Sequence, residues 1–452
     1  MNDSLRFPDG FVWGTATAAH QVEGGNFRND WWLWEQMPGH IRNNDSAAVA
    51  CDWWHRAEDD IALAARLNMG AQRVSLEWSR IEPRPGEWDE EALARYRRML
   101  ESICAQGMQP LVCLFHFTLP QWVAGRGGWE NTWTLDRFAR FVDKVAGEYG
   151  DLVRWWLTIN EPMVYTALGW VMGVWPPGKH RVFDAARVAR NLVLAHAQAY
   201  HIVHRHRPDA MVSAAMHMAS YVPHTPGARG DRIVAAARHW ATNHLWLQAT
   251  LDGVLRPPLG RFQRIGEAVD SHDYLGFQYY FTYPLAFAWR RPTNFFIQEM
   301  VDLVPGAAAM MGENRPEGLY TWARWFSRYG KPMVVTENGL LETVERQRPA
   351  YLLRALAALH RAIQEGADVR AYYHWSLVDN FEWAEGYAAR FGLVHVDFAT
   401  QQRTVKRSGW LYAEIARANA ITPEMAADID PALVGELFGS QGALSSSAGG
   451  DS

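Results

Sequence analysis

The chain has 452 residues, of which 48% are hydrophobic and 21% charged, and its formal net charge is −5. This balance is typical of a globular protein with a large core, and it excludes the strongly basic surface of a nucleic-acid-binding protein. No run of about twenty apolar residues is present, so we expect neither a nucleic-acid nor a membrane partner.

Eight short apolar stretches recur along the chain, and each is expected to form a buried strand. Helical spacing of apolar residues fills several of the intervals between them. The expected strands lie near 11–15, 71–76, 110–115, 153–160, 211–216, 274–280, 332–337 and 369–375, and the clearest helices at 89–96, 135–149, 185–206 and 351–364. This alternation predicts an α/β fold, a single (β/α)8 TIM barrel. A doubly wound sheet is the competing architecture, but no GxGxxG sequence opens the first helix.

The end of the chain differs in composition from the rest. From about residue 431 onward, Gly, Ser and Ala predominate, and such a segment buries too little apolar surface to offset its ordering entropy. We therefore assign residues 1–430 to one catalytic domain and expect residues 431–452 to be a disordered tail.

The cysteines and the chain start bear on the cell compartment. Cys51, Cys104 and Cys113 lack CxxC spacing, which argues against a disulfide framework or a zinc site. The first residues contain no basic segment followed by an apolar one, so no secretory signal is expected. A cytoplasmic protein without a metal or cofactor is the resulting interpretation.

Two glutamate motifs carry the strongest chemical signal. Residues 158–162 read Thr-Ile-Asn-Glu-Pro and residues 334–339 read Val-Val-Thr-Glu-Asn-Gly. Each is an apolar run that ends in a carboxylate followed by a helix or strand breaker, as expected where a buried strand ends. Either glutamate alone fits a helix cap or a partner for an arginine. Together, Glu161 and Glu337 indicate paired-carboxylate chemistry of the kind used in glycoside hydrolysis.

In a TIM barrel, functional side chains follow the strands at their carboxyl ends. Hydrogen-bonding, carboxylate and aromatic groups occupy these positions, which suits a ligand rich in hydroxyl groups. They are Gln21, Arg73, His116, Asn160, Glu161, Tyr280, Glu337, Trp375, Glu382 and Trp383. The set lacks the His/Asp cluster of a metal-dependent hydrolase. His201, His204 and His206 do not have HExxH spacing, and we interpret them as a solvated helix face.

With these motifs assembled, the sequence resembles glycoside hydrolase family 1, the β-glucosidase and β-galactosidase family of TIM barrels. The resemblance runs from residue 11 to about residue 412. It rests on residues 11–24, 160–162, 336–339, 375–387 and 390–397.

The resemblance implies roles for individual residues. Glu161 would be the general acid/base and Glu337 the nucleophile, with Arg73 and Tyr280 beside Glu337. The other expected residues would surround the sugar: most would form hydrogen bonds, Trp375 would stack on the ring, and Phe391 would lie near its C6 end. These are Gln21, His116, Asn160, Tyr280, Trp375, Glu382, Trp383 and Phe391.

The implied reaction is that of a retaining exo-β-glycosidase, β-glucosidase-like, which removes terminal glucosyl, galactosyl or fucosyl units from small β-glycosides or oligosaccharides. In this mechanism the two carboxyl groups lie about 5–5.5 Å apart. A carboxylate at Glu382 would repel a 6-phosphate, so unphosphorylated sugars are expected. Predominant transglycosylation uses the same two glutamates and stays open, as does a non-catalytic sugar-binding barrel.

Two departures from the family pattern stand close to these residues. Phe117 replaces the usual Trp, which removes an indole hydrogen bond expected near the sugar 3-hydroxyl. Gln278 replaces the usual Asn and is expected to move the nucleophile's hydrogen-bond network by about one methylene. The segment 340–349 is short and the segment 290–316 matches little of the family, so the aglycone preference is the least defined property.

Overall fold

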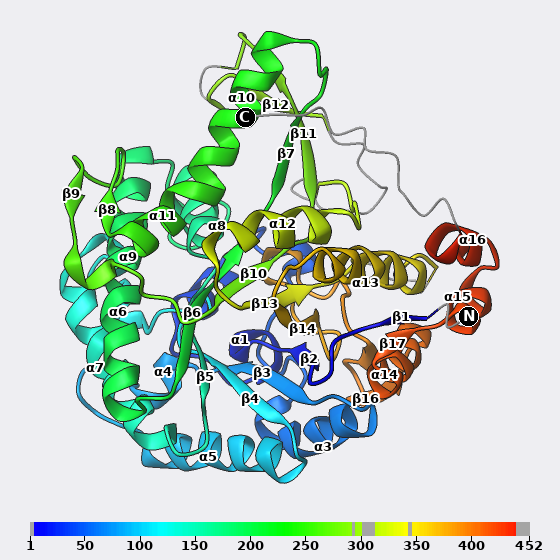
Figure 1. Ribbon diagram of the computed structural model, residues 1–452. Helices are drawn as coiled ribbons and strands as arrows, with labels where there is room; N and C mark the ends of the chain where they lie inside the picture. Colours follow the sequence, from blue (N-terminus) through cyan, green and yellow to red (C-terminus); the bar gives the residue numbers. More distant parts are fainter. Residues whose placement is uncertain (1–3, 292–293, 301–311, 342–345, 440–452) are drawn as a thin grey trace.

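A closed barrel of eight parallel strands forms the centre of the computed structural model, which describes residues 4–291, 294–300, 312–341 and 346–439 (Figure 1). The strands follow the order β10-β13-β14-β2-β3-β4-β5-β6 around the barrel. They are β2 (Val12–Ala16), β3 (Ala71–Ser75), β4 (Gln109–Cys113), β5 (Trp155–Asn160), β6 (Met211–His217), β10 (Leu275–Gln278), β13 (Met333–Asn338) and β14 (Val369–Trp375). Each predicted strand corresponds to one of these, which confirms the (β/α)8 fold.

Helices between the strands cover the outside of the barrel. The main ones are α3 (Trp53–Arg66), α5 (Glu90–Ala105), α7 (Trp133–Tyr149), α9 (Val182–His206), α11 (Leu245–Asp252), α12 (Gly318–Phe326), α13 (Arg348–Gln364) and α14 (Arg407–Ala418). The four helices expected from apolar spacing lie within α5, α7, α9 and α13. The start of α5 shows why: the Asp89 side chain accepts a hydrogen bond from the Ala92 N–H, and Glu90 and Glu91 face the positive end of the helix dipole.

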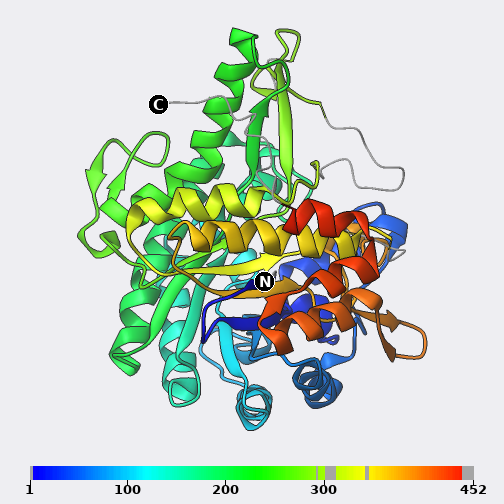
Figure 2. The same ribbon diagram turned by 45° about the vertical axis from the view of Figure 1, so that its right-hand side comes forward.

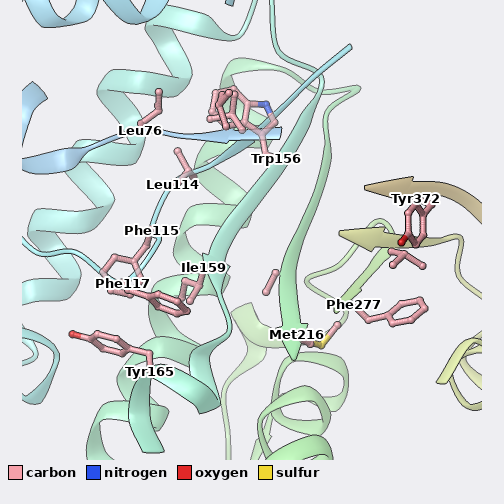
Figure 3. Packing of buried hydrophobic residues seen from close by; sticks show 14 of the residues in the cluster. Leu76, Leu114, Phe115, Phe117, Trp156, Ile159, Tyr165, Met216, Phe277 and Tyr372 are labelled. Atoms are coloured by element: carbon pink, nitrogen blue, oxygen red, sulfur yellow. The ribbon is translucent and has the colours of Figure 1, made fainter. Parts of the chain in front are cut away.

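Side chains of the strands alternate between two apolar layers. In β13, Val334 belongs to the cluster that fills the barrel interior, whereas Met333 and Val335 belong to the cluster between strands and helices. Phe277 and Trp156 extend this outer layer from β10 and β5 (Figure 3). Because both faces of each strand are buried, the strands appear in the sequence as continuous apolar runs.

Inserted segments project beyond the carboxyl ends of the strands, and we call them the arm. Its three-stranded sheet consists of β7 (Ser220–Pro223), β11 (Thr282–Phe287) and β12 (Ile297–Glu299), and α10 (Arg229–His239) packs on it. Figure 1 shows these elements projecting away from the barrel. Because β7 follows β6 and β11 follows β10, the arm stands at the end of the barrel where the strands finish.

Short elements complete the described part of the chain. The helical ones are α1 (Ala19–Val22), α2 (Asp30–Glu35), α4 (Trp78–Ile81), α6 (Gln121–Ala124), α8 (Pro162–Thr166), α15 (Pro423–Ile429), α16 (Ala432–Phe438), the π-helices η3 (Ala167–Val171) and η4 (Trp240–His244), and the 3-10 turns η1 (Arg42–Asn44), η2 (Gly128–Glu130), η5 (Gly266–Ala268), η7 (Ser327–Tyr329) and η8 (Trp383–Glu385). The strands are β1 (Leu5–Arg6), β8 (Val254–Leu255), β9 (Gln263–Arg264), β15 (Val394–Asp397), β16 (Gln402–Val405) and β17 (Ala420–Ile421).

The expected disordered tail is wrong at its beginning. Residues 432–438 form α16, which packs on α13 and α15 beside the barrel (Figure 2). Leu433 is buried, and Val434, Leu437 and Phe438 pack against the core. These four apolar side chains lie at helical spacing before the Gly/Ser-rich composition begins, so they supply the buried surface that the rest of the segment lacks. Residues 440–452 lie outside the described part.

The cysteines and helices give two further findings. Cys51 and Cys113 are buried and Cys104 is exposed, and all three carry free thiols. Over the described residues, we find no helix with the length and hydropathy needed to cross a bilayer.

Candidate active site

A cavity of about 240 Å³ opens at the carboxyl ends of the barrel strands. All of the predicted site residues except Arg73 line it. They are Gln21, His116, Asn160, Glu161, Tyr280, Glu337, Trp375, Glu382, Trp383 and Phe391. Arg73 is fully buried and lies directly behind Glu337, so the fold brings the whole predicted set together.

Glu337 is held by two donors from different strands. It lies near the end of β13 and forms an ion pair with Arg73 of β3, while the Tyr280 hydroxyl donates to its Oε2 at 2.8 Å. Burial raises the pKa of Glu337; the charge of Arg73 opposes this rise, and the charge of Glu161 adds to it. The ion pair and the phenol therefore favour a negative charge in a place where desolvation disfavours it.

Glu161 occupies a sharper turn than Glu337. Its backbone φ of 43° lies in the left-handed region, and its N–H donates to the Ala215 carbonyl at 2.8 Å. Pro162 begins helix α8 directly after it, so the chain turns from strand to helix at this residue. This backbone arrangement points the carboxyl group into the cavity, where its Oε1 lies 3.0 Å from His217 Nδ1.

The Asn160 amide is fixed on both sides. Its Oδ1 accepts from Arg73 at 2.6 Å and from Gln278 at 2.8 Å, and its Nδ2 lies 3.3 Å from His116 Nε2. Because Asn160 donates there, His116 carries its proton on Nδ1, a buried atom with no partner in the described structure. Burial holds the pKa of His116 well below its usual range, so the ring is neutral. Asn160 and His116 both line the cavity, and each keeps an N–H that makes no hydrogen bond within the described residues.

Gln278 contacts a different residue from the one expected from the sequence. The longer side chain reaches Asn160 rather than Glu337, and the strand register between β10 and β13 shifts at this residue. The extra methylene therefore acts on the amide that faces the sugar position, and not directly on the carboxylate.

Gln21 and Glu382 form the far wall. Gln21 Nε2 donates to Glu382 Oε2 at 3.2 Å and to the Phe381 carbonyl at 2.9 Å. Burial, followed by repulsion from Glu337, raises the pKa of Glu382 to about 8. Glu161, Glu337 and Glu382 share this cavity, and repulsion from neighbouring carboxyl groups adds to burial in raising the pKa of both Glu337 and Glu382.

Aromatic rings form the floor of the cavity. The His116 ring lies nearly parallel to both Trp375 and Trp383, with centroid distances of 6.0 Å to each. Trp375 ends β14, and its carbonyl leaves no room for a side chain at Gly339. Phe391 meets the Tyr280 ring edge-on at 5.8 Å. Flat apolar faces of this kind pack against the C–H faces of a sugar ring.

Phe117 is part of this apolar surface. It adopts a φ of 74° and packs parallel to Tyr165 at 6.2 Å and edge-on to Trp383 at 5.3 Å. A phenyl ring here closes the wall without offering an N–H donor, which agrees with the loss expected from the sequence.

Comparison with known proteins agrees with this geometry. The family model described as glycosyl hydrolase family 1 matches residues 3–421. The chain belongs to glycosyl hydrolase family 1. The family and the enzyme class expected from the sequence are thereby confirmed.

Relatives of this family 1 enzyme are similar over nearly their whole length. Beta-glucosidase A of Thermotoga maritima is 32% identical over 444 residues, covering 92% of this chain and 99% of that protein. A beta-glycosidase structure from Pyrococcus horikoshii has a TM-score of 0.87 at 35% identity and covers 94% and 98% of the two chains. A beta-glucosidase from Thermotoga maritima in complex with glucoimidazole has a TM-score of 0.86 at 30% identity and covers 92% and 100%.

Several cavity residues of this family 1 enzyme were not identified from the sequence. His217 is the last residue of β6, and the predicted strand stopped one residue earlier; extending it would have placed a polar side chain at a strand end, which is the usual signal. An apolar wall comes from α8, η3 and the residue after η3, and a polar one from the arm and η4. The apolar wall includes Met163, Val164, Leu168 and Met172, and the polar wall includes Tyr221, Arg238, Thr242, Tyr283 and Glu299.

Other predictions concern metals and loops. In the described part of this family 1 enzyme, no group of three or more His, Cys, Asp or Glu side chains is arranged to hold a metal ion. His204 and His206 contact Asp273 and Asp143, each at 2.9 Å, on the outside of the barrel. The segments 290–316 and 340–349 fall partly outside the described residues, at 292–293, 301–311 and 342–345.

Proposed function

We propose that the protein is a retaining exo-β-glucosidase that also accepts terminal β-galactosyl and β-fucosyl units. Its substrates are small, unphosphorylated β-glycosides and oligosaccharides. Membership of family 1 supports the chemistry, and relatives named beta-glucosidase support the glycone. A similar structure, described as a beta-glucosidase in complex with glucoimidazole, supports a small sugar-like ligand.

The observation that carries the proposal is the unequal setting of the two carboxyl groups. Glu337 has a cation and a phenol as partners, which suit an ionised nucleophile. Glu161 has a single histidine nitrogen as the partner of its carboxyl group within the described structure. It therefore has an oxygen available to carry a proton toward a leaving group.

In the first half-reaction, Glu337 attacks the anomeric carbon and forms a glycosyl ester. The bond from that carbon to the aglycone oxygen breaks, and Glu161 transfers its proton to this oxygen. The positive charge of Arg73 then faces a neutral ester, and Glu161 has become a carboxylate. In the second half-reaction, Glu161 takes a proton from water, the water oxygen bonds to the anomeric carbon, and Glu337 leaves as the carboxylate.

The polar side chains around the floor provide hydroxyl recognition. Glu382 and Gln21 would bind the hydroxyls farthest from the reacting carbon, and His116 those nearer the floor. Asn160 would donate to the 2-hydroxyl, where hydrogen bonds strengthen as the transition state develops. Trp375 would stack on one face of the ring.

Transfer to an acceptor other than water is a second activity of the same site. The apolar wall favours it, because Met163 and Val164 of α8 line the same cavity as Glu161 and offer an apolar surface to an acceptor. An apolar acceptor held there excludes water from the ester. Product analysis at high alcohol or sugar concentration tests this, and exclusive release of free glucose would count against transfer.

Two variants test the assigned roles. Glu337→Gly should abolish hydrolysis of nitrophenyl β-glucoside but still transfer glucose from α-glucosyl fluoride, which mimics the covalent intermediate. Glu161→Ala should slow poor leaving groups far more than activated ones, and azide should restore turnover as β-glucosyl azide. The exposed Glu414, in α14 and distant from the cavity, provides the control Glu414→Ala.

Stereochemistry tests the mechanism independently of the variants. The first glucose released should be the β-anomer in proton NMR spectra. An α-anomer would refute double displacement, and a panel of nitrophenyl glycosides would rank the glycones.

We also propose that the protein acts in the cytoplasm, which is supported by its three free thiols. Fractionation of cells followed by immunodetection would test the location.

A further inference from the structure

His217 contacts the carboxyl group that we assign as the acid/base. Its Nδ1 lies 3.0 Å from Glu161 Oε1, and the side chains are 16% and 11% exposed, respectively. Within the described structure, no other side chain hydrogen-bonds to this carboxyl group, and the left-handed turn at Glu161 holds only the backbone. The orientation of the carboxyl group therefore depends on this single contact.

The His217 ring is itself fixed by stacking. It lies nearly parallel to the Tyr280 ring, with centroids 6.1 Å apart and an interplanar angle of 15°. Tyr280 in turn donates its hydroxyl proton to Glu337. Each member of one stacked pair thus holds one of the two carboxyl groups, so the rings couple the placement of Glu161 to that of Glu337.

The strands and helix around His217 bring few titratable groups to it. Glu161 follows β5, Tyr280 follows β10, and Glu337 lies across the cavity on β13. Asn243, on η4, is neutral and bonds to the Ala219 backbone. Nε2 of His217 makes no hydrogen bond to any described residue, so the contacts that hold the ring are the one at Nδ1 and the stack on Tyr280.

We propose that His217 is a positioning residue that donates its Nδ1–H to Oε1 of Glu161 in both half-reactions. This inference rests on the proposed function. With Oε1 engaged, Oε2 carries the proton that passes to the aglycone oxygen. When Glu161 becomes a carboxylate, the same N–H stabilises its charge. Oε2 then accepts the proton of the attacking water, and His217 itself neither gains nor loses a proton.

Substrates with different leaving groups separate this role from a structural one. A dinitrophenyl β-glucoside leaves without acid assistance, whereas a phenyl β-glucoside needs it, and general acid catalysis is worth about 10²–10⁴-fold. His217→Phe keeps a flat ring against Tyr280 but removes the donor. We expect its kcat/KM to fall roughly 10–100-fold for the phenyl substrate and less than about 3-fold for the dinitrophenyl substrate.

The second half-reaction offers a readout of its own. For the dinitrophenyl substrate, kcat reports hydrolysis of the ester, which needs Glu161 as a base. We expect kcat of His217→Phe to fall there while kcat/KM holds, and azide, which needs no base, to restore kcat. His217→Asn keeps a donor near the Nδ1 position and should recover most of the lost activity.

His206 provides a matched control, because it makes a 2.9 Å contact with Asp143 far from the cavity. His206→Phe should behave as the unchanged protein. Equal losses on both substrates, or no loss on either, in a His217→Phe protein with an unchanged circular dichroism spectrum would overturn the inference. A folded His217→Asn protein that recovers none of the activity lost in His217→Phe would also overturn it. If the unchanged protein fails to turn over any aryl β-glucoside, the proposed function fails instead.

Discussion

Glu382 gives the most quantitative prediction, because its surroundings disfavour the negatively charged form of its carboxyl group. Repulsion from Glu337 adds to burial, and its pKa rises to about 8. Its polar partner Gln21 is neutral, and no ion pair to Glu382 exists in the described structure. Replacing it by Gln removes the charge and nearly preserves the shape. We therefore expect Glu382→Gln to stabilise the fold while it weakens substrate binding.

The size and sign follow from linkage between protonation and folding. A rise from 4.5 to about 8 means that the folded state binds this proton more tightly than the unfolded state. The contribution of this proton to the free energy of unfolding is fully present below about pH 4.5 and is lost as the pH rises to about 8. Its upper limit is ~5 kcal/mol. Water reaches part of the side chain, so we expect a loss of ~1–3 kcal/mol. A glutamine does not titrate and avoids this loss.

The assay is the free energy of unfolding measured in urea near pH 5, 7 and 8.5. The advantage of Glu382→Gln over the unchanged protein should be small near pH 5 and grow to ~1–3 kcal/mol near pH 8.5. Glu414→Gln removes the same charge from an exposed site and should follow the unchanged protein at every pH. An advantage that does not vary with pH, or a variant that is less stable near pH 8.5, would refute the reasoning.

Two substitutions test the packing and the ion pair around the site, and a thiol titration tests the burial of the cysteines. Gly318→Ala should destabilise the fold by ~1–3 kcal/mol in urea unfolding, because a methyl group there would overlap the Tyr279 ring; unchanged stability would contradict this packing. Arg73→Lys should lower kcat roughly 10²-fold and move the acidic limb of the pH–rate profile to higher pH, since the shorter ammonium keeps the charge but lies farther from the buried Glu337 carboxylate and stabilises it less; a profile that stays in place would count against the ion pair. An aromatic disulfide reagent should titrate one thiol in the native protein, that of Cys104, and three after denaturation.

Sequence patterns predicted the barrel because its strands are buried on both faces. A run such as Val334-Val335 contributes one side chain to each apolar layer, so the run itself marks the strand. The strand ends then placed the polar groups. Glu161 and Glu337 are far apart in the chain, but parallel strands carry both to the same rim, and that step requires only the fold.

Other features depend on contacts that no local pattern records. Gln278 differs from the family pattern by a methylene, and only the fold shows that it reaches Asn160. Helix α16 forms because Leu433 and its neighbours find a buried surface on α13, which composition does not reveal. His217 was missed because strand ends are uncertain by a residue, and one residue decides whether a side chain enters the cavity.

The arm and the barrel contribute different parts of the cavity. The barrel strands supply both carboxyl groups, while Tyr221, Arg238 and Glu299 of the cavity wall belong to segments inserted after β6 and β10. Insertions or exchanges in those segments can therefore alter which aglycone is admitted without disturbing the reacting centre. The polar wall of the cavity and the two reacting carboxyl groups thus belong to separate parts of the chain.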